Sequence, residues 1–135
     1  MNIEHRLTKN EIKTFDSLNI EELRNYCLSK KGVTEDMPFG DDTLVFRVMD
    51  KIFVLANLEG ELHLNLKCDP LKAIELREEH PSVIPGYHMN KKHWNTMIMD
   101  GSLSRVLIFS LIDHSYDLVV DSLSKLKKME LNKSR

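Results

Sequence analysis

The run from residue 85 to residue 94 combines a turn signal with side chains suited to nucleic-acid contact. It begins with Pro85-Gly86, a pair typical of tight turns because proline fixes one dihedral angle and glycine accepts a positive one. The run then carries two rings, two histidines, an asparagine and two lysines: Tyr87, His88, Asn90, Lys91, Lys92, His93 and Trp94. No acidic residue occurs between His80 and Met99. Lysines suit phosphates and exposed rings suit bases, so the residue types of the run are compatible with a nucleic-acid contact.

Two interpretations of this run are open from the residues alone. In the first, the lysines meet phosphates, Asn90 bonds a phosphate or a base edge, and an exposed ring stacks on a base. Lys67, at the end of a predicted strand, would join them across the sheet. In the second, the run is a structural corner in which Tyr87 and Trp94 pack into the core beneath a solvated lysine pair.

The overall charge limits how strong any nucleic-acid binding can be. The chain of 135 residues is 41% hydrophobic and 30% charged, which is typical of a soluble globular protein, and its formal net charge is −2. Dedicated nucleic-acid binders usually carry a basic excess, so binding here would come from a local patch. We therefore expect non-specific affinity, with a Kd on the order of 10⁻⁴ to 10⁻⁶ M.

The cysteine count and the N-terminal residues indicate the compartment. The chain has two cysteines, Cys27 and Cys68, and residues 1–6 do not resemble a signal peptide. No apolar run approaches the roughly 20 residues that a membrane span requires. These features predict a cytoplasmic protein with reduced thiols and no membrane association.

The pattern of apolar residues predicts one α+β domain over 19–130, preceded by an N-terminal arm or short helix over 1–18 and followed by a frayed tail over 131–135. Helices are expected over 20–31 and from Asp69-Pro70 to Pro81, with Asn19 and Asp69 as N-caps. A C-terminal helical pair should begin at a Ser102 cap and break at residues 113–115, where Ser115 would cap the second helix.

The strands are expected over 43–49, 51–58, 62–67 and 94–99, with a short extended segment over 82–84. Residues 62–67 alternate regularly, which predicts three buried leucines and exposes His63, Asn65 and Lys67 on the opposite face. The short connections between the first three strands imply an antiparallel meander with one solvated face.

Four stretches, in order and spacing, resemble the MmcQ/YjbR family of small bacterial proteins: Met37-Pro38-Phe39-Gly40-Asp41, Leu64-Asn65-Leu66-Lys67-Cys68-Asp69-Pro70, residues 85–94 and Ser115-Tyr116-Asp117-Leu118-Val119. The resemblance covers roughly residues 20–126, and its most specific part is Pro-Gly-Tyr-His-Met-x-Lys-x-His-Trp. It implies an antiparallel sheet with helices packed on one face, of the CyaY/frataxin-like kind. It also implies DNA binding, the function with which family members are usually labelled.

The residues favour neither a metal site nor catalysis. His88 and His93 are five residues apart in a turn, and zinc needs three or four ligands at recognisable spacing. The run His114-Ser115-Tyr116-Asp117 holds the residue types of a triad, but triad members meet through the fold and not by adjacency. Cys68 near His63 is more simply a small buried residue than a nucleophile. We therefore expect no cofactor, no metal and no enzymatic activity.

The alternative to DNA binding is a non-enzymatic protein-interaction module that uses the same loop. An acidic stretch, formed by Glu35, Asp36, Asp41 and Asp42, is opposite in charge to residues 80–99. That polarity could steer a protein partner or pair two copies as a weak homodimer.

Overall fold

The computed structural model describes residues 18–86 and 89–133, which form one mixed α and β structure. Its helices are α2 (Ile20–Leu28), α3 (Pro70–Glu79), α4 (Arg105–Asp121) and α5 (Lys125–Lys133). Its strands are β1 (Val33–Asp36), β2 (Thr43–Val48), β3 (Lys51–Asn57), β4 (His63–Lys67), β5 (Val83–Pro85) and β6 (Trp94–Ile98). Within these ranges no helix is long and apolar enough to cross a bilayer.

The six strands form a single sheet in the order β1-β2-β3-β4-β6-β5, and every neighbouring pair is antiparallel. The predicted meander is therefore confirmed for β2, β3 and β4. Met49 and Asp50 connect β2 to β3 with φ angles of 48° and 70°. Two consecutive positive φ angles are typical of a type I′ hairpin turn, whose twist matches that of the flanking strands.

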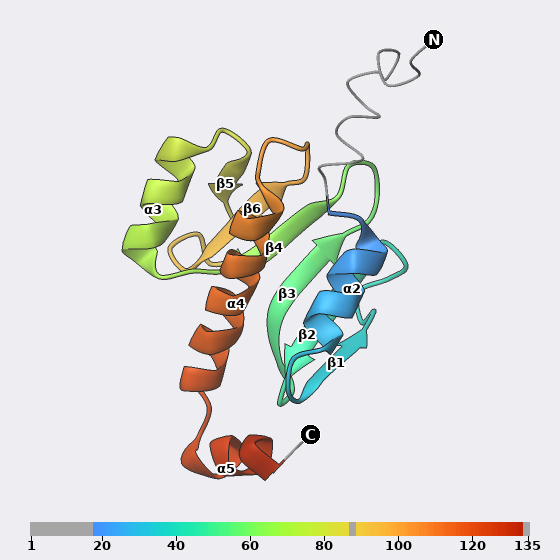
Figure 1. The fold of residues 1–135 in the computed structure, drawn as a ribbon, viewed down its shortest axis with the longest axis vertical. Helices are drawn as coiled ribbons and strands as arrows, with labels where there is room; N and C mark the ends of the chain where they lie inside the picture. Colours follow the sequence, from blue (N-terminus) through green and yellow to red (C-terminus); the bar gives the residue numbers. More distant parts are fainter. Residues whose placement is uncertain (1–17, 87–88, 134–135) are drawn as a thin grey trace.

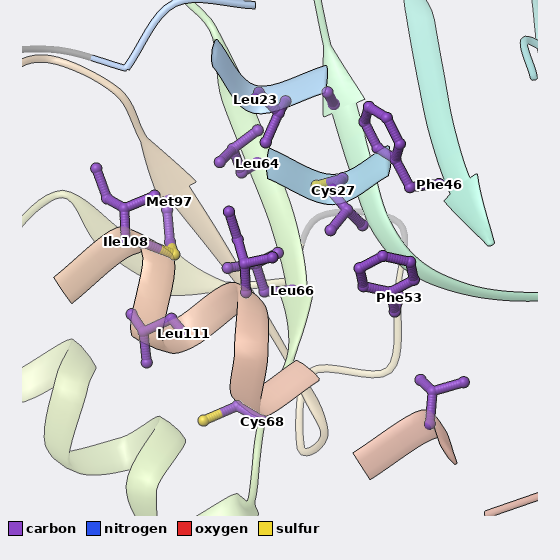
Figure 2. Packing of buried hydrophobic residues seen from close by; sticks show 14 of the residues in the cluster. Leu23, Cys27, Phe46, Phe53, Leu64, Leu66, Cys68, Met97, Ile108 and Leu111 are labelled. Atoms are coloured by element: carbon purple, nitrogen blue, oxygen red, sulfur yellow. The ribbon is translucent and has the colours of Figure 1, made fainter. Parts of the chain in front are cut away.

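Helices α2, α3 and α4 cover one face of the sheet (Figure 1). Side chains from both layers meet between them in one hydrophobic core, and Figure 2 shows Leu23 and Cys27 of α2 near Phe46, Leu64 and other strand residues. The core residues of β2 and β4 alternate along each strand, as the pleat requires, and the consecutive core residues Phe53 and Val54 of β3 lie where the register with β2 shifts. The described helices thus leave the opposite face of the sheet without a helical cover.

Contacts between α2 and α4 join the helical layer. The rings of Tyr26 and Phe109 stack with centroids 4.2 Å apart. The Tyr26 hydroxyl donates to Asp113 at 2.6 Å, and Asp113 also pairs with the Lys30 ammonium at 2.5 Å. Burial, together with the Asp113 carboxylate, raises the pKa of Tyr26 to about 12, so the phenol remains a donor at physiological pH.

The predicted N-caps of the first two helices are confirmed, and one strand was missed. Asn19 accepts from the Glu22 N–H at 2.9 Å, and Asp69 accepts from the Lys72 N–H at 3.3 Å. Helix α2 ends at Leu28, three residues before its predicted end, because the chain turns into β1. This four-residue edge strand, which carries Glu35 and Asp36, was not among the predicted strands.

The predicted break at residues 113–115 is wrong. Helix α4 is continuous from Arg105 to Asp121, with Ser104 as its N-cap in place of Ser102. Ser115 does not cap a helix; it lies fully buried in the middle of α4. Its hydroxyl donates to the Phe53 C=O at 2.6 Å and accepts from the Lys67 N–H at 2.9 Å.

The predicted ends of the chain also differ from the structure. Helix α5 continues to Lys133 and Leu131 is buried in the core, so residues 131–133 are not a frayed tail. Leu18 is likewise buried in the core and is not part of an arm. The rest of the predicted arm, residues 1–17, lies outside the described residues, as do residues 134–135.

Replacing Ser115 by Ala should lower the free energy of unfolding by about 1–3 kcal/mol, the typical cost of leaving a buried polar backbone group without a partner. Chemical denaturation measures the change. Ser110→Ala is the matched control, since Ser110 is exposed on the same helix and should tolerate the change within about 0.5 kcal/mol. Equal stabilities for the two variants would contradict a bridging role for Ser115.

Candidate nucleic-acid interface

A tight turn presents Lys91 and Lys92 immediately before β6. The side-chain oxygen of Asn90 accepts from the Lys92 N–H at 2.9 Å, and its backbone C=O accepts from the His93 N–H at 3.2 Å. This side-chain-capped turn is one that asparagine favours. Asn90 was predicted to contact a phosphate or a base edge, and its side-chain oxygen also forms this turn. Both lysine side chains are exposed.

The Pro85-Gly86 pair does not form the predicted turn. Pro85 belongs to β5 and pairs with Asn95, and Gly86 extends that pairing by donating its N–H to the Trp94 C=O at 2.8 Å. Gly86 has no positive φ angle. It is needed because a Cβ at this position would lie 2.7 Å from the Trp94 Cβ. Two of the predicted site residues, Tyr87 and His88, lie outside the described residues.

Arg77 of α3 anchors the turn from the helical side of the sheet. Its guanidinium donates to the Lys91 C=O at 3.0 Å and to the Asn95 side-chain oxygen at 3.3 Å. Asn95 in turn donates to the Ala73 C=O at 3.2 Å, so the turn, β6 and α3 are linked. Sequence reasoning missed Arg77, which lies in a different element 14 residues before Lys91.

Strand β4 anchors the turn from its other side. The Cys68 N–H donates to the His93 C=O at 2.8 Å, directly after the last β4–β6 pair, Lys67 with Trp94. Cross-strand partners have their side chains on the same face of a sheet. Lys67 and Trp94 are therefore neighbours, both half-buried, on the face that carries no described helix.

Asn65 corrects the expectation that every second residue of β4 is solvent-exposed. It is only 1% exposed, and its side-chain oxygen accepts from the Thr96 hydroxyl at 2.5 Å. Thr96 is its cross-strand partner on β6. Because β4 is an interior strand, its central side chain is flanked by strands on both sides. His63 and Lys67, nearer the ends of β4, are half-buried.

Three consecutive backbone N–H groups hold the end of β4 in place. Those of Lys67 and Cys68 bond to Ser115 and to the His93 carbonyl, and that of Asp69 donates to the His114 Nε2 at 3.1 Å. His114 can accept this bond only when Nε2 is unprotonated. Its pKa is lowered, first by burial and then by the Lys72 ammonium, against the opposing effect of Asp69 and Asp117.

The His114 bond predicts a component of stability that depends on pH. The lowered pKa means that the folded chain binds a proton more weakly than the unfolded chain, whose ordinary value is 6.5. This contribution is fully present above pH 6.5 and is lost as the pH falls through the folded pKa. His114→Gln keeps an acceptor but cannot titrate, so the variant should lose less stability on acidification.

Denaturation curves of the wild type and His114→Gln at several pH values from neutral downward measure this difference. Other titrating groups contribute equally to both proteins. Parallel losses of stability below pH 6.5 would contradict a neutral, accepting His114.

The lysines of the candidate site have no acidic partners among the described residues. The ion pairs that the structure gives for residues 18–86 and 89–133 involve other groups: Arg24–Glu35, Lys30–Asp113, Arg47–Asp36, Glu22–Arg105, Lys127–Glu130 and, when the imidazole is protonated, Glu79–His80. Two members of the predicted acidic stretch, Glu35 and Asp36, are thus paired with arginines. The bond from Arg24 lowers the pKa of Glu35. This pairing reduces the polarity on which the protein-interaction alternative rests.

The groups considered for other chemistry are engaged in the fold. Burial raises the pKa of Cys68 to about 11 and that of Cys27 to about 12, so both thiols are protonated at neutral pH. Ser115 and His114 bond to backbone groups, as described above. Within the described part of the chain, no three His, Cys, Asp or Glu side chains come together in a way that could hold a metal ion.

Comparison with known proteins assigns this chain to a family. The model of the YjbR family matches residues 28–118, which include Lys67 and the turn before β6. The chain belongs to the YjbR family. The predicted MmcQ/YjbR relationship is thereby confirmed.

Relatives of this YjbR family member occur in several bacteria. YbdF of Escherichia coli O157:H7 is 45% identical over 65% of this chain and 73% of its own length. YjbR of Escherichia coli K12 is 34% identical over 82% of this chain and 95% of its own length. The crystal structure of protein DR2400 from Deinococcus radiodurans is 38% identical, covers 84% of this chain and 88% of its own, and has a TM-score of 0.81.

Proposed function

We propose that this YjbR family protein is a weak, largely sequence-tolerant DNA-binding protein that contacts phosphates through the Tyr87–Trp94 loop. The observation that carries the proposal is the placement of Lys91 and Lys92. Both are exposed at a turn that is bonded to α3 and β4, and neither has an acidic partner among the described residues. Lys67 and Arg77 add positive charge beside the same turn.

The anchoring of this turn favours electrostatic contact. Lysine pairs on flexible loops lose conformational entropy when they bind, whereas this backbone is already held by Arg77, Cys68 and Asn90. Phosphate contacts carry no sequence information by themselves, which is why we propose sequence tolerance. With a formal net charge of −2 the whole molecule adds no attraction, so we expect a Kd on the order of 10⁻⁴ to 10⁻⁶ M.

We also propose that the fold is of the CyaY/frataxin-like kind and that the protein acts in the cytoplasm. An antiparallel sheet with helices α2, α3 and α4 on one face supports the first proposal. The use of two buried cysteines as reduced thiols supports the second.

Replacing Lys91 and Lys92 together by Ala should weaken duplex binding equally for unrelated sequences. Each phosphate contact releases counterions, so the slope of log K against log salt should fall by about 1.8 if both lysines meet phosphates. Fluorescence anisotropy of a labelled duplex at several salt concentrations measures both effects. Lys125→Ala with Lys133→Ala is the matched control, since it removes the same charge from exposed positions on α5.

An unchanged salt slope in the Lys91 and Lys92 double variant would show that these lysines do not meet phosphates. A failure of the wild type to bind duplex in low salt at about 50 µM, within the non-specific range, would remove the DNA proposal. The non-enzymatic protein-interaction module would then be the remaining proposal for this loop.

A further inference from the structure

The face of the sheet that carries no described helix has a tryptophan directly beside the lysine turn. Alternation along β4 and β6 assigns the faces: Leu64 and Met97 are paired and belong to the core. The other set, which includes the Lys67–Trp94 pair, therefore lies on the opposite face. Trp94 is also the first residue of β6, adjoining the turn that carries Lys91 and Lys92.

The surroundings of Trp94 leave its indole partly accessible. Its side chain is half-buried, and the neighbour across from it on the β5 side is Gly86, which has no side chain to cover the ring. On the β4 side the neighbour is Lys67, a cation on a flexible stem. A flat aromatic surface flanked by positive charge is the combination that single-stranded nucleic-acid sites use, with bases stacked on rings and the backbone following the cations.

We infer that this face binds unpaired bases, so that the preferred ligand is single-stranded DNA, with one base stacked on Trp94 and the adjoining phosphates at Lys67, Lys91 and Lys92. The inference rests on the proposed function and names its substrate class. In a duplex each base is already stacked between its neighbours, and only its edges are accessible in the grooves. A single strand offers its bases for stacking without the cost of opening a helix.

The polar pair beside Lys67 and Trp94 on the same face explains why such binding would be sequence-tolerant. Asn65 lies two residues before Lys67 on β4, and Thr96 lies two residues after Trp94 on β6, so this pair shares the same face of the sheet. Both side chains are buried and bonded to each other. Their polar groups are therefore occupied and do not present a free pattern of donors and acceptors to a base edge. Stacking remains, and every base has a face that can stack.

Trp94 is the only tryptophan in the chain, so its intrinsic fluorescence reports directly on this site. Wild-type protein is titrated with oligothymidylate of about 12 nucleotides, within the range of known single-strand sites, and separately with a duplex of equal length. We expect saturable quenching of Trp94 by the single strand, at an affinity at least about fivefold above that for the duplex. Fivefold corresponds to the lower end of measured base–aromatic stacking.

Two variants separate stacking from charge. Trp94→Phe keeps a ring and should retain most single-strand binding, measured by anisotropy of labelled oligothymidylate. Trp94→Leu keeps an apolar side chain without a ring and should weaken single-strand binding at least about fivefold relative to Trp94→Phe. Circular dichroism shows whether the leucine variant is folded, and the wild-type titration tests the inference independently of either variant.

The outcomes distinguish the inference from the proposed function. If single strand and duplex bind equally and Trp94 emission does not change, the inference is overturned and the phosphate contact through Lys91 and Lys92 stands. Equal binding by the phenylalanine and leucine variants would also overturn it. If neither nucleic acid binds in low salt, both the inference and the proposed function fail.

Discussion

The structure depends on how the buried end of β4 satisfies its backbone. β3 and β4 pair from Asn57–His63 to Val54–Leu66, and beyond that point the two strands separate. The next residues are in the interior, where an unpaired N–H group is costly. The Ser115 hydroxyl fills the opening by joining the Lys67 N–H to the Phe53 C=O. One side chain of α4 thus bridges two backbone groups of β3 and β4 that do not bond to each other directly.

The same few residues determine where the charged turn lies. Immediately after Lys67, the Cys68 N–H donates to the His93 carbonyl, and the Asp69 N–H donates to His114, the residue before Ser115 in α4. Helix α3 then begins and returns Arg77 to the Lys91 carbonyl. The turn before β6 is therefore bonded to α3 directly and to α4 through the end of β4. This arrangement keeps Lys91 and Lys92 close to Lys67 and Trp94 before any ligand arrives.

Local patterns predicted the elements, and tertiary contacts account for what they missed. The burial of Leu64 and Leu66 and the caps at Asn19 and Asp69 depend on neighbours in the chain, and they were predicted correctly. The predicted exposure of Asn65 was wrong, because it depends on the strands on either side of β4. Strand β1 is short and becomes recognisable only through its pairing with β2. The run at residues 113–115 has the composition of a cap, but the core and the sheet opening keep α4 continuous.

The candidate site likewise has residues that the sequence predicted and residues that only the fold brings into place. Lys91, Lys92 and Trp94 were predicted from composition, and the pairing of Lys67 with Trp94 agrees with the predicted contact across the sheet. Arg77 could not be predicted, because its link to Lys91 requires α3 to pack beside the turn. Gly86 was assigned to a turn because glycine commonly occurs there, and its close approach to Trp94 is visible only in three dimensions.

The most direct test of this account is a map of the residues that respond to single-stranded DNA. Amide and indole NMR spectra of the ¹⁵N-labelled protein would be recorded while oligothymidylate is added. The largest shifts are expected at the Trp94 indole and at the amides of Lys67, Lys91 and Lys92. Shifts confined to α2 or α5, with these four signals unchanged, would contradict it.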